Sequence, residues 1–369
     1  MSRAALLGAL TLSTACPGPG PDSSVDSQPV QDTAPDIPLE FEGLDPALFE
    51  APDGLWQARH ATVEPDRGLV WERDPDFYLD RMSVPHILPM PDGSFVMLAT
   101  SLDEPQGRWY LTSPDGLNWT MAEQALFVSG DFPADCGNRL EDGTVIHEQG
   151  GGARLILEAT QLQKTTGRTD WRAWCHAYAA DGVSFEPQEG YFYEGSEQDG
   201  GQISVPSPLH LADWSALIYY QGDLYSEVGG VEEGNGVRIA RVAAGSAEAE
   251  PWITSNVLPE GMLDPMPVYL EGGGVRLYHT YNVPPEELSP DSPGPSPGYA
   301  ETSDGPNLGP STRLFEVEGN CMDTDNGGEC LLDPFFLRLD DGTLVLYFTW
   351  FTAEGGATGM RIGRAFAVD

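Results

Sequence analysis

Basic residues are scarce in this sequence, which has 18 Lys and Arg against 58 Asp and Glu and a formal net charge of −40. A surface with this charge repels phosphate backbones, so we expect no nucleic-acid partner. The period of 3.6 residues that marks long helices is also lacking, and short strand-like runs bounded by Gly, Pro, Asn and Asp take its place. These runs, in a chain with 43 Gly and 32 Pro, predict an all-β fold.

No long hydrophobic run opens the chain, since the apolar stretch at residues 4–12 is too short to span a bilayer as a helix. It follows a basic start and precedes small residues and Cys16, a pattern that resembles a bacterial lipoprotein signal peptide over residues 1–15. We therefore expect lipidation of Cys16 and anchoring in the bacterial cell envelope, at the periplasmic or cell surface. An ordinary cleaved secretory signal is the alternative. Residues 16–40 are rich in Pro, Ser, Asp and Gln and predict a disordered tether before a folded, monomeric domain at residues 41–369.

Cysteine is rare as well, with four residues besides Cys16. An even number in an exported protein indicates two disulfides, for which three pairings exist. We favour the pairs Cys136–Cys175 and Cys321–Cys330, because the first two lie in one repeat and the second two close a short loop. No Cys-x-x-Cys spacing is present, which disfavours a zinc site.

A hairpin pattern recurs along the chain. Its copies begin near Val84, Thr144, Val205, Asp264 and Asp333, in steps of 60, 61, 59 and 69 residues. A repeat of this kind, with about four strands in each copy, predicts a β-propeller of five blades. The last copy ends before its fourth strand, whereas residues 68–73 form an unpaired strand-like run before the first copy. We expect this N-terminal strand to complete the last blade and close the ring.

Two kinds of motif connect these repeats to a known superfamily. Asp-Pro opens an innermost strand at Asp264 and at Asp333, and a Ser-x-Asp-Gly-x-x-aromatic turn spans residues 113–119. Over residues 68–369 the chain resembles the five-bladed propeller glycosidases, which include arabinanases, β-xylosidases and invertase-like enzymes. The resemblance implies a glycan ligand. It also implies three carboxylates, acting as base, pKa modulator and general acid, at the starts of the innermost strands of the first three blades.

The acids of this chain are distributed differently. The aligned positions of repeats one and three are Val84 and Val205, and the nearest acids in repeat two are Asp142 and Glu148. The clear acids are Asp264 and Asp333, which we predict to be catalytic. The alternative is that each Asp only caps the entry of its strand through local hydrogen bonds.

Other residues extend the candidate site. Three residues at or near the starts of innermost strands are predicted to bind substrate: Arg81, His86 and His147. The alternatives are that the arginine forms a surface ion pair and that the histidines have structural roles. Asp323, Asp325 and Glu329 resemble half of a Ca²⁺ loop, so Ca²⁺ is the one cofactor considered, against a disulfide-closed acidic turn.

Two functions are compatible with these features. The first is a carbohydrate-active propeller, either a divergent glycoside hydrolase or a glycan binder. The second is a non-enzymatic cell-surface propeller that mediates protein interactions. The fold by itself does not decide between them.

Overall fold

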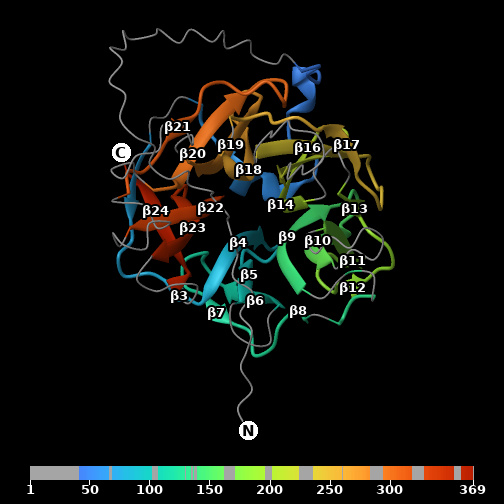
Figure 1. The fold of residues 1–369 in the computed structure, drawn as a ribbon, viewed down its shortest axis with the longest axis horizontal. Helices are drawn as coiled ribbons and strands as arrows, with labels where there is room; N and C mark the ends of the chain where they lie inside the picture. Colours follow the sequence, from blue (N-terminus) through green and yellow to red (C-terminus); the bar gives the residue numbers. More distant parts are fainter. Residues whose placement is uncertain are drawn as a thin grey trace, which may run out of the picture. The chain divides into compact units, whose positions relative to one another are not determined.

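Five innermost strands contact one another around a central axis, and each belongs to a separate, mainly antiparallel sheet (Figure 1). This arrangement is the five-bladed β-propeller that the repeats predict. The computed structural model describes residues 41–368 except 66–68, 102–106, 129, 134–135, 137–138, 162–170, 196–201, 224–235, 260, 283–293, 318–327 and 353–358. The signal peptide and the tether predicted for residues 1–40 lie outside the described residues.

The first three blades follow in chain order. Blade one consists of β4 (Met82–Pro89), β5 (Phe95–Ser101), β6 (Gly107–Ser113) and β7 (Thr120–Met121), and β8 (Phe127–Val128) also pairs with β6. Blade two consists of β9 (Arg139–His147), β10 (Ala153–Gln161), β11 (Trp171–Ala179) and β12 (Glu186–Pro187), and β13 (Tyr193–Glu194) also pairs with β11. Blade three consists of β14 (Gln202–His210), β15 (Ala216–Asp223), β16 (Gly236–Val242) and β17 (Glu250–Ile253).

The last two blades include strands from the N-terminal part of the chain. Blade four consists of β18 (Leu263–Leu270), β19 (Val275–Tyr281), β20 (Ser296–Thr302) and β21 (Thr312–Arg313), with β1 (Thr62–Val63) added in parallel to β18. Blade five consists of β22 (Glu329–Arg338), β23 (Leu344–Thr352) and β24 (Arg361–Val368), with β2 (Val70–Arg73) and β3 (Leu79–Asp80) both paired to β24. The antiparallel pairing of β2 with β24 confirms the predicted closure of the ring by an N-terminal strand.

Apolar strands hold the blades together. Residues 345–349 on β23 are all buried, because both faces of a middle strand pack against neighbouring blades. The disulfide Cys136–Cys175 joins two buried cysteines of blade two, as predicted. Cys330 is also disulfide-bonded, but its predicted partner Cys321 lies outside the described residues, so that pairing stays a prediction.

An N-terminal strap, defined here as residues 41–63, crosses the end of the ring where the innermost strands finish. It contains the 3₁₀ helices η1 (Pro46–Leu48) and η2 (Trp56–Ala61) and strand β1. The Nδ1 atom of His60 lies 2.7 Å from the carbonyl oxygen of Arg338, and Arg59 forms an ion pair with Asp340 at 3.0 Å. The strap therefore lies across one end of the axis, and the bulged starts of the innermost strands face the other end.

Candidate functional site

Every innermost strand has a β-bulge in its first half, at the open end of the axis. In four blades the bulge is an X-Pro pair whose first residue has a positive φ: 51° at Val84, 47° at Val205, 54° at Asp264 and 50° at Asp333. A positive φ is costly for residues other than glycine, and especially for a β-branched valine, so this backbone is strained. Strained positions that recur around one axis mark a candidate functional site.

The bulge of blade two corrects the sequence alignment. It consists of Glu141 and Asp142, opposite Glu158 of β10, so the aligned position is Glu141 and the prediction of Thr144 was wrong by three residues. Without the Asp-Pro or Val-Pro pair, the sequence of this blade does not mark where the bulge lies. The correction places two further acids at the open end of the axis.

The bulges of blades one, three and five also connect these blades to the preceding ones. A bulged residue leaves the hydrogen-bond ladder of its own sheet, so its N–H is free to bond elsewhere. The N–H of Val84 donates to the hydroxyl of Thr349 at 2.8 Å, and that of Asp333 donates to the hydroxyl of Thr280 at 3.2 Å. The Thr280 hydroxyl in turn donates to Oδ2 of Asp264 at 2.6 Å, which links the Asp264 carboxyl group of blade four to the backbone of Asp333 in blade five.

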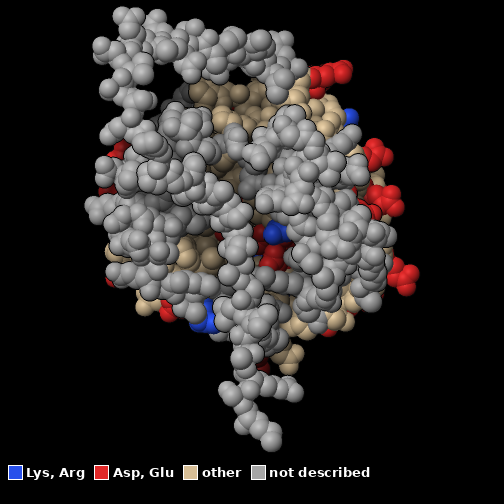
Figure 2. Space-filling view, in the orientation of Figure 1, with Lys and Arg blue, Asp and Glu red and all other residues tan. Residues whose placement is uncertain are grey.

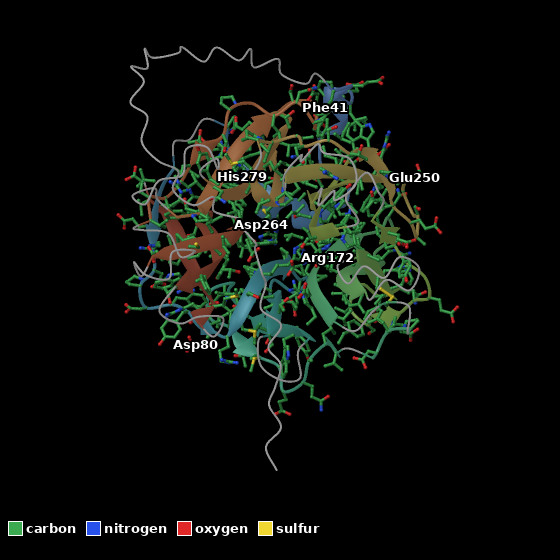
Figure 3. All side chains as sticks on the ribbon, viewed as in Figure 1. Phe41, Asp80, Arg172, Glu250, Asp264 and His279 are labelled. Carbon is green, nitrogen blue, oxygen red and sulfur yellow. A yellow bond between two sulfur atoms is a disulfide. The ribbon has the colours of Figure 1, made fainter. Side chains whose placement is uncertain are left out.

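Three carboxyl groups from three blades line one small cavity at the bulges. Asp142, Asp264 and Asp333 surround it together with Val84 and Val205, and its volume is about 30 Å³. Acidic and basic side chains lie together in the hollow at the middle of the ring (Figure 2), and Asp264 and Arg172 are near that centre (Figure 3). We call this place the axial acid cavity.

An ion pair lies next to Val205, one of the residues that line the axial acid cavity. Glu158 is completely buried and forms an ion pair with Arg172, whose guanidinium also donates to the hydroxyl of Ser204 at 3.0 Å. The Ser204 hydroxyl donates to Oε2 of Glu158 at 2.6 Å, and the N–H of Val205 donates to the same oxygen at 3.3 Å. Glu158 therefore joins the second blade to the bulge of the third.

Arg108 supplies a second buried cation near the acids. Its guanidinium donates to the hydroxyl of Thr100 at 2.7 Å and to the carbonyl oxygen of Gly143 at 3.0 Å. Burial lowers the pKa of Arg108 to about 10, although the carboxyl groups of Asp142 and Asp333 act in the opposite direction. The guanidinium remains charged at neutral pH and partly compensates the acids.

Burial raises the pKa of four acids around the axis. The pKa of Asp142 is raised to about 7, by burial first and by Glu141 second. Burial raises the pKa of Glu158, while the ion pair with Arg172 acts against this shift. Burial also raises the pKa of Asp264, opposed by the hydrogen bonds from Thr280 and from the backbone of Asp333. Burial and the charge of Asp264 hold the pKa of Asp333 well above its usual range, so protonated carboxyl groups are available here near neutral pH.

Histidines occupy the part of the axis beneath the strap. A second cavity, of about 100 Å³, is lined by His86, His147 and His210, with Gln57 of the strap. Burial lowers the pKa of His86 to about 3, that of His147 to about 3 and that of His210 to about 4, so these rings are neutral. The amide nitrogen of Gln57 lies 3.3 Å from Nδ1 of His147.

The structure thus separates the residues that sequence reasoning grouped together. Asp264 and Asp333 line the axial acid cavity, and His86 lies between it and the second cavity, which His147 also lines. Arg81 is half-buried just before the first bulge, and its N–H donates to the carbonyl oxygen of Met360.

The remaining predicted ligands are not joined into one site. Glu329 pairs with Arg73 at 2.9 Å, whereas Asp323 and Asp325 lie outside the described residues, so a Ca²⁺ loop there stays a prediction. Glu148, the other acid considered in repeat two, pairs with Arg154. In the described part of the chain no group of three or more His, Cys, Asp or Glu is arranged to hold a metal ion. Nor is any described helix long and apolar enough to cross a membrane.

Sequence reasoning missed Glu158, Arg108, Arg172 and His210. The first three come from second and third strands rather than from innermost strands, and only Glu158 lies opposite a bulge. One signal was available: Glu158 is a lone acid in the apolar run Leu155-Ile156-Leu157-Glu158-Ala159. A charge in such a run must find a partner when the strand is buried.

Known proteins share the fold without close sequence similarity. No protein-family model and no curated protein matches the sequence. A thermostable family-43 glycoside hydrolase matches with a TM-score of 0.60 and 14% identity, over 79% of this chain and 91% of that chain. A Bacillus subtilis arabinanase matches with a TM-score of 0.52 and 14% identity, over 80% of this chain and 96% of that chain. A glycosyl hydrolase from Bacteroides ovatus matches with a TM-score of 0.54 and 12% identity, over 87% of this chain and 96% of that chain. At these identities the similarity shows the fold alone.

Proposed function

We propose that this protein is a carbohydrate-active propeller that hydrolyses a glycan at the axial acid cavity. The observation that carries the proposal is the convergence of Asp142, Asp264 and Asp333, from three different blades, on one cavity at the open end of the axis. Glycoside hydrolysis needs carboxyl groups around one sugar carbon, with their pKa values set apart by their surroundings. The known structures that share this fold include glycoside hydrolases, which supports the same reading.

The surroundings assign different roles to the two aspartates. Asp264 accepts a hydrogen bond from Thr280, and this bond opposes the rise in its pKa. Asp333 also has a hydrogen bond from Thr349 that lowers its pKa, but burial and the charges of Asp264 and Asp142 raise that pKa more strongly. We assign Asp333 as the proton donor to the leaving oxygen and Asp264 as the carboxylate that activates water or stabilises positive charge on the sugar. Asp142 modulates the pKa of Asp333, because its charge also raises that pKa.

The size of the cavity determines what it can hold. A volume of about 30 Å³ accepts about one or two water molecules or one sugar hydroxyl group, not a sugar ring. The ring must therefore sit outside the cavity, with the attacking water or a hydroxyl group held between the carboxyl groups.

Glycan binding without hydrolysis is the second candidate, and one observation favours it. The bulged positions of blades one and three carry Val84 and Val205, which can neither donate nor accept a proton. A propeller that kept only part of its acid set would still hold sugar hydroxyl groups through Asp142, Asp264 and Asp333.

The test is a screen of purified residues 41–369 against aryl glycosides and plant and bacterial polysaccharides, read by product formation and by thermal shift. The variants are Asp264→Asn, Asp333→Asn and the control Asp53→Asn, which changes an exposed strap residue at the other end of the ring. We expect turnover in the wild type and the control, and a loss of at least about a hundredfold in the axial variants. A thermal shift without turnover would favour the binder, and no response to any glycan would reject both forms of the proposal.

We also propose that the protein is exported and lipid-anchored at Cys16. This rests on the basic start, the short apolar run and the small residues before that cysteine. Expression of the full chain in a bacterium with labelled palmitate should label the wild type and leave Cys16→Ser unlabelled. Equal labelling of both proteins, or of neither, would reject lipidation at this residue.

A further inference from the structure

The turn after the third strand is built in the same way in blades one and four. In blade one, the side-chain nitrogen of Asn118 donates to Oδ2 of Asp115 at 2.7 Å, and the backbone N–H of Asn118 donates to Oδ1 at 2.8 Å. In blade four, Asn307 donates to Asp304 through the same pairs of atoms, at 2.7 and 3.2 Å. The aspartate thus orients the asparagine side chain identically in the two turns.

The turns are also seated in the same way on the preceding blade. The hydroxyl of Tyr219 donates to the carbonyl oxygen of Gly305 at 3.1 Å, and the hydroxyl of Tyr347 donates to that of Gly116. Both glycines have a positive φ, as the turn requires. The two turns therefore match in their local geometry and in the tyrosine that each one contacts on the preceding blade.

In blade four the asparagine holds a segment of main chain. The N–H of Phe41 donates to Oδ1 of Asn307 at 2.9 Å, and Nδ2 of Asn307 donates to the carbonyl oxygen of Phe41 at 3.1 Å. The N–H of Leu44 then donates to the carbonyl oxygen of Asp304 at 3.0 Å. Between them, a Cβ atom on Gly43 would meet the Asp304 side chain at 2.5 Å, so only glycine fits there. The main chain of the strap is thus held at Phe41 and Leu44, with glycine required between them.

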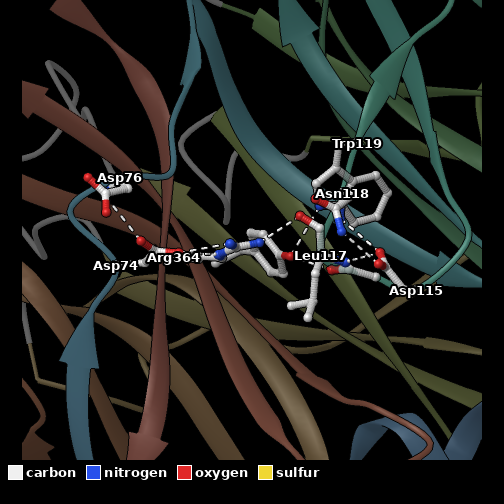
Figure 4. Close-up of polar contacts among 9 residues, drawn as sticks. Asp74, Asp76, Asp115, Leu117, Asn118, Trp119 and Arg364 are labelled. Atoms are coloured by element: carbon white, nitrogen blue, oxygen red, sulfur yellow. Dashed lines mark hydrogen bonds and ion pairs between the residues drawn. The ribbon is translucent and has the colours of Figure 1, made fainter.

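In blade one the equivalent asparagine holds no described segment. Asn118 is exposed, and its Oδ1 atom accepts no hydrogen bond from any described residue, which leaves the atom that binds the peptide N–H in blade four available. It borders a cavity of about 360 Å³ that Asp74, Leu117, Trp119 and Arg364 also line (Figure 4). The site is framed on two sides, by the blade-one turn and by residues 74–79.

We propose that the blade-one turn is a docking site for an extended, basic segment of a partner protein, whose main chain is held by Asn118 as that of Phe41 is held by Asn307. The side chain next to the bound amide would pack on Leu117 and Trp119, as Phe41 and Leu44 pack, together with Leu308, against one hydrophobic core.

The charges of the site favour a basic partner. Arg364 donates to Asp74 at 2.8 and 2.9 Å and to the carbonyl oxygen of Leu117 at 2.6 Å, so its charge is already compensated. Asp76 forms no ion pair with a described residue, and Asp115 bonds only within its own turn (Figure 4). A second copy of this chain is disfavoured as the partner, because each copy carries a formal charge of −40.

The probe is a fluorescein-labelled peptide that copies residues 40–46 with Glu40, Glu42 and Asp45 replaced by lysine. Its binding to the full-length protein is followed by fluorescence polarisation, beside a scrambled peptide of the same composition that controls for attraction to the net charge. Asn118→Ala should weaken binding at least about fivefold, because two hydrogen bonds to the peptide amide are lost. Methylation of the phenylalanine N–H should weaken binding to the wild type by a similar factor.

Two variants make the result specific to blade one. Ser184→Ala changes the corresponding turn of blade two, where a serine replaces the asparagine, and should leave the affinity unchanged. Asn307→Ala tests whether the peptide instead replaces the strap in blade four. Loss of binding in this variant but not in Asn118→Ala would overturn the proposal. So would equal affinities for the scrambled peptide, or no binding to folded wild-type protein up to about 1 mM peptide.

Discussion

Thr280 connects the two proposed catalytic aspartates, and its replacement by valine tests that connection. The hydroxyl donates to Asp264 at 2.6 Å and accepts the N–H of Asp333 at 3.2 Å, and the residue is 1% exposed. Valine has nearly the same shape, so Thr280→Val removes both hydrogen bonds without opening a large cavity.

The expected cost follows from the two bonds. A hydrogen bond to an ionised group contributes about 1.5–3 kcal/mol and a neutral one about 0.5–1.5 kcal/mol. In the variant, the N–H of Asp333 still has Oδ2 of Asp264 as an acceptor at 3.4 Å. The free-energy cost of losing its bond to Thr280 is therefore smaller. We therefore expect Thr280→Val to lower the free energy of unfolding by about 2–3 kcal/mol when Asp264 is ionised.

The loss of folding stability in Thr280→Val should also grow as the pH rises. The Thr280 hydrogen bond opposes the rise in the pKa of Asp264, so its removal raises that pKa further. Below the wild-type pKa both proteins hold a protonated Asp264, and only neutral bonds, worth about 1–2 kcal/mol, are lost. Above it the wild type ionises and the variant does not, so the variant loses more stability as pH rises.

Urea unfolding at pH 5 and pH 8 measures this difference, with Thr112→Val on the exposed face of β6 as the control. We expect the control to change the free energy of unfolding by less than about 0.5 kcal/mol at both pH values. A cost for Thr280→Val below about 0.5 kcal/mol at both pH values, or a larger cost at pH 5 than at pH 8, would refute this reasoning.

Three further predictions concern closure, the disulfide and catalysis. Trp71→Ala should lower the free energy of unfolding in urea by about 3–5 kcal/mol, because Trp71 is the buried side chain of the closing strand. Val70→Ala should cost little, because Val70 is 60% exposed. Equal costs for the two variants would contradict the closure by β2. Replacing both Cys136 and Cys175 by alanine should lower the free energy of unfolding by about 4 kcal/mol, because the disulfide limits the chain entropy of the unfolded state over a sequence separation of 39. A loss below about 1 kcal/mol would contradict this stabilising role. Asp142→Asn removes a charge that raises the pKa of Asp333, so the alkaline limb of kcat/KM should move to lower pH; an unmoved limb would exclude Asp142 as the modulator.

Much of the fold could be predicted because local chemistry repeats with the blades. The X-Pro pairs at Asp264 and Asp333 mark the bulges, and the Asp-Gly turns mark the connection after the third strand. The unpaired run at residues 68–73 and the missing last strand together predicted the closure, since an open sheet edge would otherwise remain.

The site could be predicted only in part. The positions of its other residues depend on how the strands pair and how the blades pack, which the sequence does not show directly. Glu158 lies opposite a bulge that carries no proline, so the sequence does not show that it faces the axis. Arg108 and Arg172 come from third strands, and their relation to the acids depends on how neighbouring blades pack. The strap is a further case, because Gln57 and His60 meet residues of other blades that are about 90 or more positions away along the chain.

A crystal structure of Asp333→Asn with a glycan identified by the screen would test the central claim most directly. This variant should bind the glycan and hydrolyse it slowly. The account predicts a sugar ring over the open end of the axis, with a hydroxyl group or the glycosidic oxygen within hydrogen-bonding distance of Asp142 or Asp264. A sugar bound on the outer surface of the ring, with the axial acid cavity holding none of its atoms, would contradict the account.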